Sequence, residues 1–482
     1  MKSILFGEII MKKIKMKKRF GFIGTLMVAV AMVALTGVAH AQTKINPNNL
    51  IYPIGEGKFT WASYHDFAKA HDYSGQQLTI TSRWTGGFGQ KGENMWAYFA
   101  KATGADVRHI GSQTFKQDVV ANLEGGSPAN LTAFQLVGFG KDMAKRGFLT
   151  PLCSDMAHCE LLDWFRDNYA SGQDWLDSAT WEGPDGKMHW YGPHYHAFHF
   201  PIVYYVPENF EDAGYKVPQT FEELKALEDQ IVADGETPWC HGLFAEGSTG
   251  FTGELMMAEF LLRREPIEVY DKYSTNEIKM DDPRIVAALE ETGKRLRNEK
   301  YVAGGATQVA TLDWRESAKG IFNNPPDCYL YHGGTYIPTL FPEDKKYGDW
   351  DFFYFPKPSN KPGFAKFPVI GGGAFFTITK DSPAARGLLE WLKTPIAAEL
   401  MMAQGGHLTP HKHVNTALFP DPATAAMNEM LMNADPFRFH ASGVMPSAVG
   451  GVCLNRAMVE YVGGKSAKEV LRGCQEVWDG LK

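Results

Sequence analysis

Short strand-like and helix-like segments alternate along most of this chain, and this alternation constrains its fold more than any other feature. Residues 78–84, 106–111, 130–138 and 201–206 are runs of strand length, rich in apolar or β-branched side chains. A helical pattern follows the first of these runs at 92–104 and ends at a glycine. Such alternation predicts an α/β fold in which helices cover mostly parallel sheets.

Several later helices have clear starting signals. Thr220 and Glu223 have the spacing of a capping box, and Gly235 is placed to end the helix that follows. A capping side chain directly before a proline, which favours the first helical position, occurs at Asp282-Pro283, Ser382-Pro383 and Thr394-Pro395.

Residues 16–41 are typical of a secretory signal peptide. A basic front at 17–19 precedes an apolar run at 20–38, and Ala39 and Ala41 supply the small residues that a leader peptidase requires. We expect export to the periplasm and cleavage after Ala41. An uncleaved anchor helix is the alternative.

With 482 residues, the chain is too long for a single hydrophobic core and is expected to form two or more lobes. No Ser/Gly-rich linker separates them, which predicts several chain crossings between lobes. The net charge of −7 gives no general attraction for nucleic acid or an anionic membrane surface, and favours a neutral small ligand.

Six cysteines in an exported protein predict up to three disulfides. Cys153 and Cys159 share one short loop and can close on each other. Cys453 and Cys474 lie at matched distances on either side of a turn at Gly463-Gly464, so an antiparallel helix pair brings them level. Elimination leaves Cys240 with Cys328. Free buried thiols are the alternative; a zinc site is disfavoured because no CxxC spacing occurs.

The run from Gly87 to Gly92 matches G-x-G-x-x-G, a pattern found in dinucleotide-binding folds. The acidic residue expected at the end of the second strand is missing, and Asp106 stands at its start. We therefore interpret the run as a glycine loop at a strand's carboxyl end, where a ligand approaches backbone N–H groups.

Aromatic residues are abundant, and many must be core, but three lie beside glycine-rich loops. Trp84 precedes Gly86-Gly87, Phe251 follows Gly250, and Tyr336 follows His332-Gly333-Gly334. A flat ring beside a polar loop suits a sugar, because the ring packs on C–H groups while nearby polar groups bind hydroxyls.

Histidines occur in two groups along the chain: His194, His196 and His199 form the first, and His407, His411 and His413 form the second. His194 and His196 share one face of an extended segment, so a metal site is one hypothesis. No carboxylate or thiolate nearby completes it, and we favour hydrogen bonds to ligand hydroxyls or backbone. No metal and no cofactor are expected. No serine or cysteine nucleophile signature occurs, but a pair of carboxylates for glycoside cleavage stays open.

Three segments resemble a known family: FPIVYYVPENFEDAGYKVPQTFEELKAL, CYLYHGGTYIPTLFPED and FPVIGGGAFFTITKDSPAARGLLEWL. They are similar to the periplasmic solute-binding proteins of carbohydrate ABC importers, family 1, the group that includes maltose-binding protein. PWCHGLFAEGSTGFTG and the stretch after it look closest to the α-glucoside-binding branch. The resemblance covers nearly the whole mature chain.

The resemblance implies a type II periplasmic-binding-protein fold with two α/β lobes and three hinge crossings. The N-terminal lobe would comprise 42–200 plus 370–408, and the C-terminal lobe 201–369 plus 409–482. The crossings are expected near 200–203, 369–374 and 408–410.

The resemblance also implies where the ligand binds. Gln135 stands where the group has an aromatic residue, and His199 stands where maltose-binding protein has a carboxylate. The expected ligand-binding residues are Trp84, Gly86, Gly87, Gln135, His196, His199, Glu246, Gly250, Phe251, His332, Tyr336 and Gly372.

The function implied is that of a monomeric periplasmic receptor, not an enzyme. It would capture an α-glucoside or other neutral oligosaccharide by hinge closure and deliver it to an inner-membrane permease served by a cytoplasmic ATPase. A periplasmic hydrolase acting on glycans is the alternative, and metal capture by the histidines is a third hypothesis.

Overall fold

The computed structural model describes residues 42–357 and 364–481. The expected signal peptide and its cleavage site after Ala41 lie outside these residues. In the described ranges, the strands form two larger sheets and one hairpin.

The larger sheet has seven strands, and its centre is parallel. Strand β2 pairs in parallel with β3 and β4, whereas β12 runs antiparallel to β4 and β7, so the sheet is mixed rather than mostly parallel. Its strands are β1 (Thr43–Lys44), β2 (Gln77–Ser82), β3 (Asp106–Gly111), β4 (Leu131–Phe134), β7 (His194–His199), β12 (Val369–Ile378) and β13 (Phe437–Phe439).

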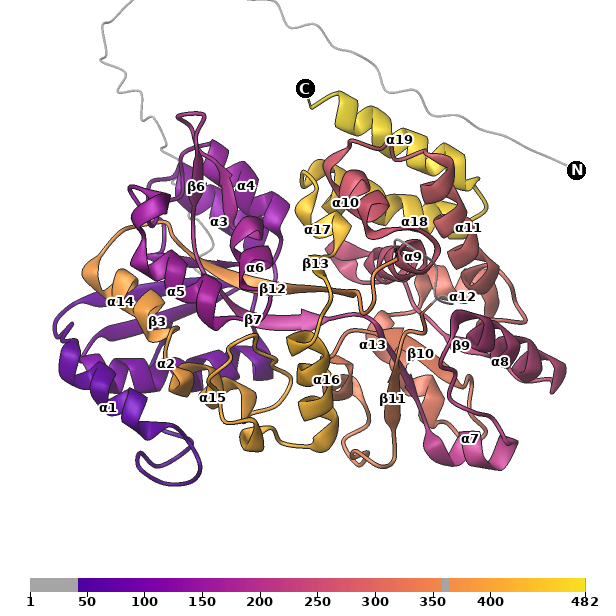
Figure 1. The fold of residues 1–482 in the computed structure, drawn as a ribbon, viewed down its shortest axis with the longest axis horizontal. Helices are drawn as coiled ribbons and strands as arrows, with labels where there is room; N and C mark the ends of the chain where they lie inside the picture. The colour runs from indigo at the N-terminus through magenta and orange to yellow at the C-terminus, as the bar shows by residue number, and fades with distance from the viewer. Residues whose placement is uncertain (1–41, 358–363, 482) are drawn as a thin grey trace, which may run out of the picture. The chain divides into compact units, whose positions relative to one another are not determined.

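Strand β12 organises this sheet, because it pairs with three other strands. All ten of its residues are buried, and it lies beside β7 (Figure 1). A run this apolar is what a strand covered on both faces requires.

The second sheet has four strands in the order β11-β8-β10-β9. The chain enters it directly from β7, because β8 begins three residues after β7 ends. Its strands are β8 (Ile202–Tyr205), β9 (Trp239–Cys240), β10 (Leu330–Gly333) and β11 (Asp351–Tyr354); the separate hairpin pairs β5 (Thr180–Glu182) with β6 (Met188–Trp190).

Helices surround both sheets. Those in the first half of the chain are α1 (Trp61–Ala70), α2 (Gly86–Thr103), α3 (Phe115–Glu124), α4 (Val137–Lys145), α5 (Glu160–Asn168), α6 (Gly172–Ser178), α7 (Pro207–Ala213) and α8 (Phe221–Ala233). The others are α9 (Phe251–Arg264), α10 (Ile267–Thr275), α11 (Pro283–Leu296), α12 (Gly305–Thr311), α13 (Trp314–Ser317), α14 (Pro383–Trp391), α15 (Pro395–Met402), α16 (Pro422–Met432), α17 (Ala441–Val444), α18 (Asn455–Val462) and α19 (Ala467–Asp479).

Short 3₁₀ helices connect these elements: η1 (Met156–His158), η2 (Glu246–Ser248), η3 (Ala318–Phe322), η4 (Ile337–Leu340) and η5 (Thr416–Leu418). A π-helical segment, η6 (Ala448–Leu454), runs into α18. None of the helices in the described part of the chain is both long enough and apolar enough to cross a membrane.

The predicted starting signals are confirmed. Thr220 and Glu223 form both hydrogen bonds of the capping box at the start of α8. Asp282, Ser382 and Thr394 each accept a hydrogen bond from a backbone N–H of the helix that follows, and a proline occupies the first turn in all three.

The predicted glycine loop at 87–92 is wrong, because α2 already begins at Gly86. The glycines serve close packing of the helix. A Cβ on Gly89 would lie 3.0 Å from the Trp84 carbonyl oxygen, and one on Gly92 would lie 3.2 Å from the rings of Trp84 and Trp96. The pattern therefore reflects how tightly α2 approaches the end of β2.

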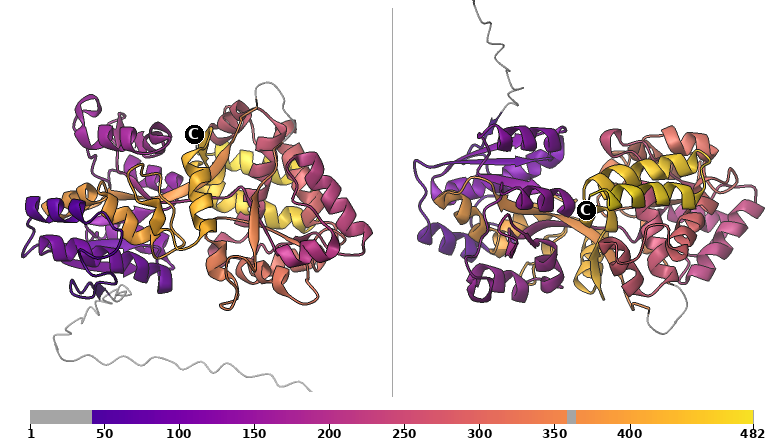
Figure 2. Two further views of the ribbon diagram at one scale, coloured as in Figure 1. Left: turned by 60° about the horizontal axis from the view of Figure 1, so that its bottom comes forward. Right: turned by 90° about the horizontal axis from the view of Figure 1, so that it is seen from above.

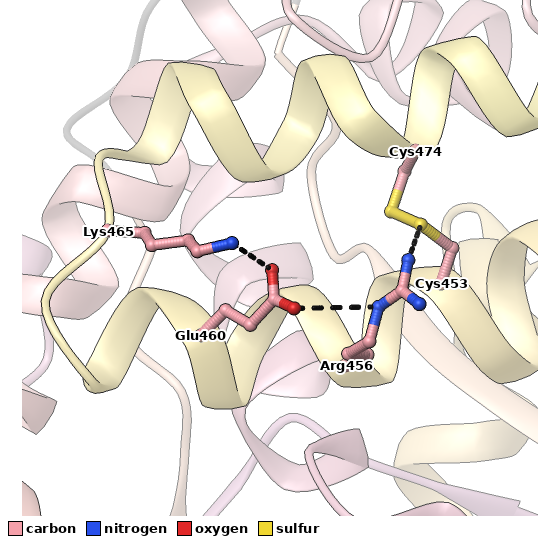
Figure 3. Close-up of a disulfide and its surroundings, with 5 residues drawn as sticks. All are labelled: Cys453, Arg456, Glu460, Lys465 and Cys474. Atoms are coloured by element: carbon pink, nitrogen blue, oxygen red, sulfur yellow. Dashed lines mark hydrogen bonds and ion pairs between the residues drawn. A yellow bond between two sulfur atoms is a disulfide. The ribbon is translucent and has the colours of Figure 1, made fainter.

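Three disulfides form, and their pairs are those that the spacing predicted: Cys153–Cys159, Cys240–Cys328 and Cys453–Cys474. The last joins η6 to α19, which lies alongside α18 (Figure 2). Figure 3 shows Arg456 beside this disulfide, with its Nη2 3.7 Å from Cys453 Sγ.

The strand β13 departs from the expected lobe boundary at residue 409. That boundary assigns 437–439 to the C-terminal lobe, whereas β13 pairs with β12 in the seven-stranded sheet. Arg438 in β13 also forms ion pairs with Asp174 of α6 and Asp271 of α10, so this strand contacts residues of both expected lobes.

Candidate ligand-binding site

A polar pocket lies where strands of both sheets end. One wall comes from the segments after β2, β3 and β4, and its lining residues are Arg83, Gln113, Phe115, Lys116, Gln117, Gln135, Leu136 and Phe139. The opposite wall is η2, which follows β9 of the four-stranded sheet. Ligands in open α/β folds bind at this carboxyl edge of the strands.

The lining of the pocket combines hydrogen-bonding groups with a few apolar side chains. Three amide side chains line it, and Gln113 is held in place by a hydrogen bond from its Nε2 to Thr85 Oγ1. Phe115 and Phe139 also line the pocket, and both are buried. Amides that both donate and accept suit a ligand rich in hydroxyl groups.

Charges of both signs meet at this pocket. Arg83 is open to solvent, and partial desolvation followed by the charge of Arg315 lowers its pKa, while Glu246 and Tyr336 oppose that shift. The pKa of Lys116 is also lowered, first by burial and then by Arg83. These side chains therefore lie close enough to act on one another across the two walls.

Glu246 has an unusual backbone. Its φ is +51°, a left-handed conformation that non-glycine residues adopt infrequently. Such conformations cost energy and tend to occur at functional sites. The carboxylate is exposed, and in the residues that the structure describes it has neither a hydrogen bond nor an ion pair.

A row of half-buried rings leads away from this pocket. The rings of Phe251 and Trp314 lie 5.4 Å apart, those of Trp314 and Tyr336 5.9 Å, and those of Tyr336 and Phe198 5.9 Å, all edge to face. Arg315 lies 4.9 Å above the Trp314 ring. Because each ring keeps part of its surface open, the row offers apolar faces next to polar groups.

Several predicted site residues lie at this pocket or in this row. Gln135 and Glu246 line the pocket, and Phe251 and Tyr336 belong to the row. Gly86 and Gly87 form the exposed first turn of α2, and a Cβ on either would meet nothing within 4 Å. Their backbone is thus open to approach.

Trp84, in contrast, is packed into the core. Only 3% of it is exposed, and its ring stacks on Trp96 at 5.9 Å and meets Phe88 and Phe376 edge-on. Arg83, its neighbour, is the residue of this loop that lines the pocket. Direct stacking of Trp84 on a ligand stays a prediction that this placement does not favour.

The predicted histidines are buried as well. His196 lies against Phe88 and His407, with ring centres 5.0 and 4.8 Å away. His199 Nε2 lies 2.7 Å from the Met427 carbonyl oxygen, and His332 packs on Phe355. Burial lowers the pKa of His196 and His199 to about 4 and that of His332 to about 3, so all three are neutral at pH 7.

No cluster of three or more His, Cys, Asp or Glu side chains that could hold a metal occurs among the described residues. The hypothesis of metal capture therefore has no geometric support there.

Two predicted glycines have structural reasons of their own. Gly250 has φ +106° at the start of α9, and a Cβ there would overlap the carbonyl oxygen of Asn455. A Cβ on Gly372 would lie 2.8 Å from the ring of Phe198, so this glycine makes room for a ring of the aromatic row.

Sequence reasoning missed Arg83, Lys116, Trp314 and Arg315. The position of Arg83, one residue after a strand end and beside the predicted Trp84, was the available signal. Trp314 and Arg315 lie far along the chain from the other site residues, and only the tertiary fold brings them together.

Residues 85–399 match the model of the bacterial extracellular solute-binding protein family, and the chain belongs to this family. It is therefore a solute-binding protein rather than an enzyme, and has the two-lobed α/β fold of such receptors.

Among its relatives, the chain is 43% identical over 461 residues to the alpha-glucosides-binding periplasmic protein AglE of Rhizobium meliloti, covering 95% of this chain and 99% of AglE. It is 32% identical over 407 residues to the osmoprotective compounds-binding protein GgtB of Synechocystis sp., covering 84% and 93%. The solved structure of the bacterial solute receptor AcbH shares the fold with a TM-score of 0.66 at 14% identity, covering 85% and 98%.

Proposed function

We propose that this chain is the periplasmic substrate-binding component of an ABC sugar importer that captures an α-glucoside or another neutral oligosaccharide. The observation that carries this proposal is the 43% identity to AglE across almost the full length of both proteins. The name of that relative states its ligand class, and the coverage leaves no lobe of this chain unmatched.

The geometry of the pocket supports a neutral, hydroxyl-rich ligand. Arg83 and Glu246 approach from opposite walls and, within the described ranges, neither side chain has a hydrogen bond or ion pair. One donates and the other accepts, so a ligand hydroxyl can satisfy both. The half-buried rings of Trp314 and Tyr336 supply faces for the C–H groups of a sugar.

Binding is proposed to involve hinge motion. The pocket has a volume of about 110 Å³, below the roughly 300–1,000 Å³ typical of small-molecule sites. An oligosaccharide therefore needs the walls to separate, and closure around it is stabilised by contacts absent from the open state. The hinge would use the crossings near 200–203, 369–374 and 408–410, between lobes 42–200 plus 370–408 and 201–369 plus 409–482, except that β13 pairs with the seven-stranded sheet.

The proposal also covers export, oligomeric state and partners. The leader ending at Ala41 would direct the chain to the periplasm, where it acts as a monomer. It would deliver sugar to inner-membrane permease subunits, and a cytoplasmic ATPase would supply the energy.

The test is calorimetric titration of the mature chain with maltose, trehalose and sucrose, with reducing-sugar release followed in parallel. Saturable heat with a dissociation constant in the micromolar range, about −8 kcal/mol, and no hydrolysis is the expected result. If no neutral glycoside in the panel produces heat or raises the melting temperature, the proposal is wrong.

Arg83→Gln should weaken binding of the same glycoside by at least about tenfold, because a charge-assisted hydrogen bond is lost. Arg386→Gln is the matched control, since Arg386 pairs with Asp381 on an exposed helix end. Equal loss of affinity in both variants would remove Arg83 from the site.

A further inference from the structure

Helix α4 touches a segment that belongs to a different core, and this contact borders the pocket. Val137 and Met143 of α4 are buried with the seven-stranded sheet, and Phe139 of the same helix lines the pocket. The segment 441–451, which holds α17 and the start of η6, is buried instead among α9, α10, α11, α18 and α19.

Three polar or steric contacts join the two parts. The Nζ of Lys141 donates to the Val444 carbonyl oxygen at 3.5 Å. The backbone N–H of Ser447 acts to lower the pKa of the Asp142 carboxyl, against the larger raising effect of burial, so this amide lies close to the carboxylate. Between them, Gly138 lies against Met445.

Gly138 is the closest point of this contact. A Cβ built on it would overlap the Met445 carbonyl oxygen and lie 3.0 Å from the carbonyl carbon and 3.5 Å from the Ser447 nitrogen. Glycine is a poor helix former compared with alanine, so its place inside α4 weakens the helix itself. The close approach to Met445 is what glycine permits at this position.

The segment 441–451 is held in place by bonds to neighbouring helices of its own core. Ser442 Oγ donates to Glu254 Oε2 at 2.7 Å. The disulfide between Cys453 and Cys474 ties η6 to α19 (Figure 3). The segment 441–451 is thus anchored to the core that it shares with α9 and α19. If this core moves relative to the seven-stranded sheet, the contact of 441–451 with α4 must form or break.

The pocket lies directly beside this contact. Leu136 and Phe139 flank Gly138 in sequence and line the pocket. Lys116, another lining residue, reaches toward the same segment, with its Nζ 3.3 Å from where a Cβ on Gly451 would lie. A change in the distance between α4 and 441–451 therefore moves residues that line one wall of the pocket.

We propose that the contact of α4 with residues 441–451 is a latch, which closes with the pocket and slows the release of the bound solute. Gly138 allows the close approach of the two segments, and Lys141 and Asp142 add polar contacts between them. The latch rests on the proposed function, because it presumes a solute held between the two walls.

The test compares Gly138→Ala with Gly473→Ala, a helical glycine in α19 whose Cβ would meet nothing within 4 Å. Gly138→Ala should speed dissociation of the bound glycoside about tenfold or more, because the new methyl group holds α4 away from Met445. It should leave the melting temperature of the ligand-free protein unchanged or raised. Gly473→Ala should leave dissociation within twofold of the wild type.

Binding by the wild type separates failure of the latch from failure of the proposed function: a wild type that binds no glycoside contradicts the proposed function, whereas failure of the latch leaves that binding intact. Hydrogen exchange at the Ser447 amide should slow when the wild type or Gly473→Ala is saturated with glycoside, and should slow less in Gly138→Ala. Lys141→Met, which keeps the aliphatic stem, should act in the same direction but more weakly.

Two outcomes would overturn the latch. One is wild-type dissociation and wild-type Ser447 exchange in Gly138→Ala. The other is loss of folding, or a lowered melting temperature without ligand, in Gly138→Ala, which would make the contact a permanent part of the fold.

Discussion

At the scale of single residues, two tryptophans that look alike in sequence have different surroundings. Trp84 is 3% exposed and surrounded by Trp96, Phe88 and Phe376. Trp314 is half-buried and belongs to the row of rings beside the pocket. The difference decides what each contributes, since a buried ring stabilises the fold and a half-exposed ring is available to a ligand.

Trp84→Ala should lower the free energy of unfolding by about 3–5 kcal/mol, the range for deletion of a large buried ring. Trp314→Ala should lower stability much less and weaken glycoside binding about tenfold. Urea unfolding and calorimetric titration of both variants check this. The assignment is wrong if Trp84→Ala keeps wild-type stability and loses binding.

The same pair shows what local sequence can and cannot reveal about the site. Glycine and polar neighbours predicted that three aromatic rings contact a ligand. Phe251 and Tyr336 lie in the row of half-buried rings, and their contact with a ligand stays a prediction. For Trp84 the placement does not favour that contact, because α2 begins at Gly86 and packs its own glycines against that ring. Arg315 is far from Arg83 in the chain, and only the tertiary fold brings it close enough to affect the pKa of Arg83. No local sequence pattern encodes this proximity.

At the scale of secondary-structure elements, the starts of the capped helices were the most predictable feature. Capping side chains and first-turn prolines act within a few residues, so α8, α11, α14 and α15 begin where the sequence indicates. The three-residue strand β13 was not predicted. Its pairing with β12 depends on a partner more than sixty residues away in the chain.

A buried ion network joins two of these helices. Arg295 of α11 bonds to Glu228 of α8 at 2.6 and 2.7 Å and to Glu291 at 2.8 Å. The side chains of all three are at most 4% exposed. Removing one member of such a network leaves a buried charge without compensation.

Arg295→Met should therefore lower the free energy of unfolding by about 3–5 kcal/mol. The control is Arg386→Met, which breaks an exposed ion pair with Asp381 and should cost no more than about 1 kcal/mol. Urea denaturation at pH 7 measures both. Similar losses in the two variants would mean that the buried network contributes no more than a surface pair.

At the scale of the whole molecule, buried histidines make the fold sensitive to acid. Burial lowers the pKa of His194 to about 3 and of His440 to about 4, and the same cause acts on His196, His199, His241, His332, His407 and His411. Each binds a proton more readily in the unfolded chain, whose histidines titrate near 6.5. Their contribution to stability is thus complete above pH 6.5 and is lost as the pH falls toward 4.

Within the described ranges, burial raises the pKa of five carboxyl groups, which act in the opposite sense: Asp142, Asp174, Glu228, Glu254 and Glu259. Burial raises the pKa of Glu254 and Glu259 to about 7, so the folded chain retains their protons and their contribution is lost as the pH rises from about 4.5 to 7. Eight histidines outweigh five carboxyls, because each group changes stability by at most about 1.4 kcal/mol per pH unit. Acidification should therefore destabilise the molecule.

We expect the free energy of unfolding to fall by roughly 5 kcal/mol or more between pH 6.5 and 4.5, measured by urea denaturation across that range. His332→Phe removes one buried imidazole and should make the dependence shallower by about 1.4 kcal/mol per pH unit, whatever it costs at neutral pH. His65→Gln, at an exposed position of α1, should leave the slope unchanged. A flat profile in the wild type, or equal slopes in both variants, would mean that these imidazoles are not held neutral by burial, and that acid unfolding of this receptor has another cause.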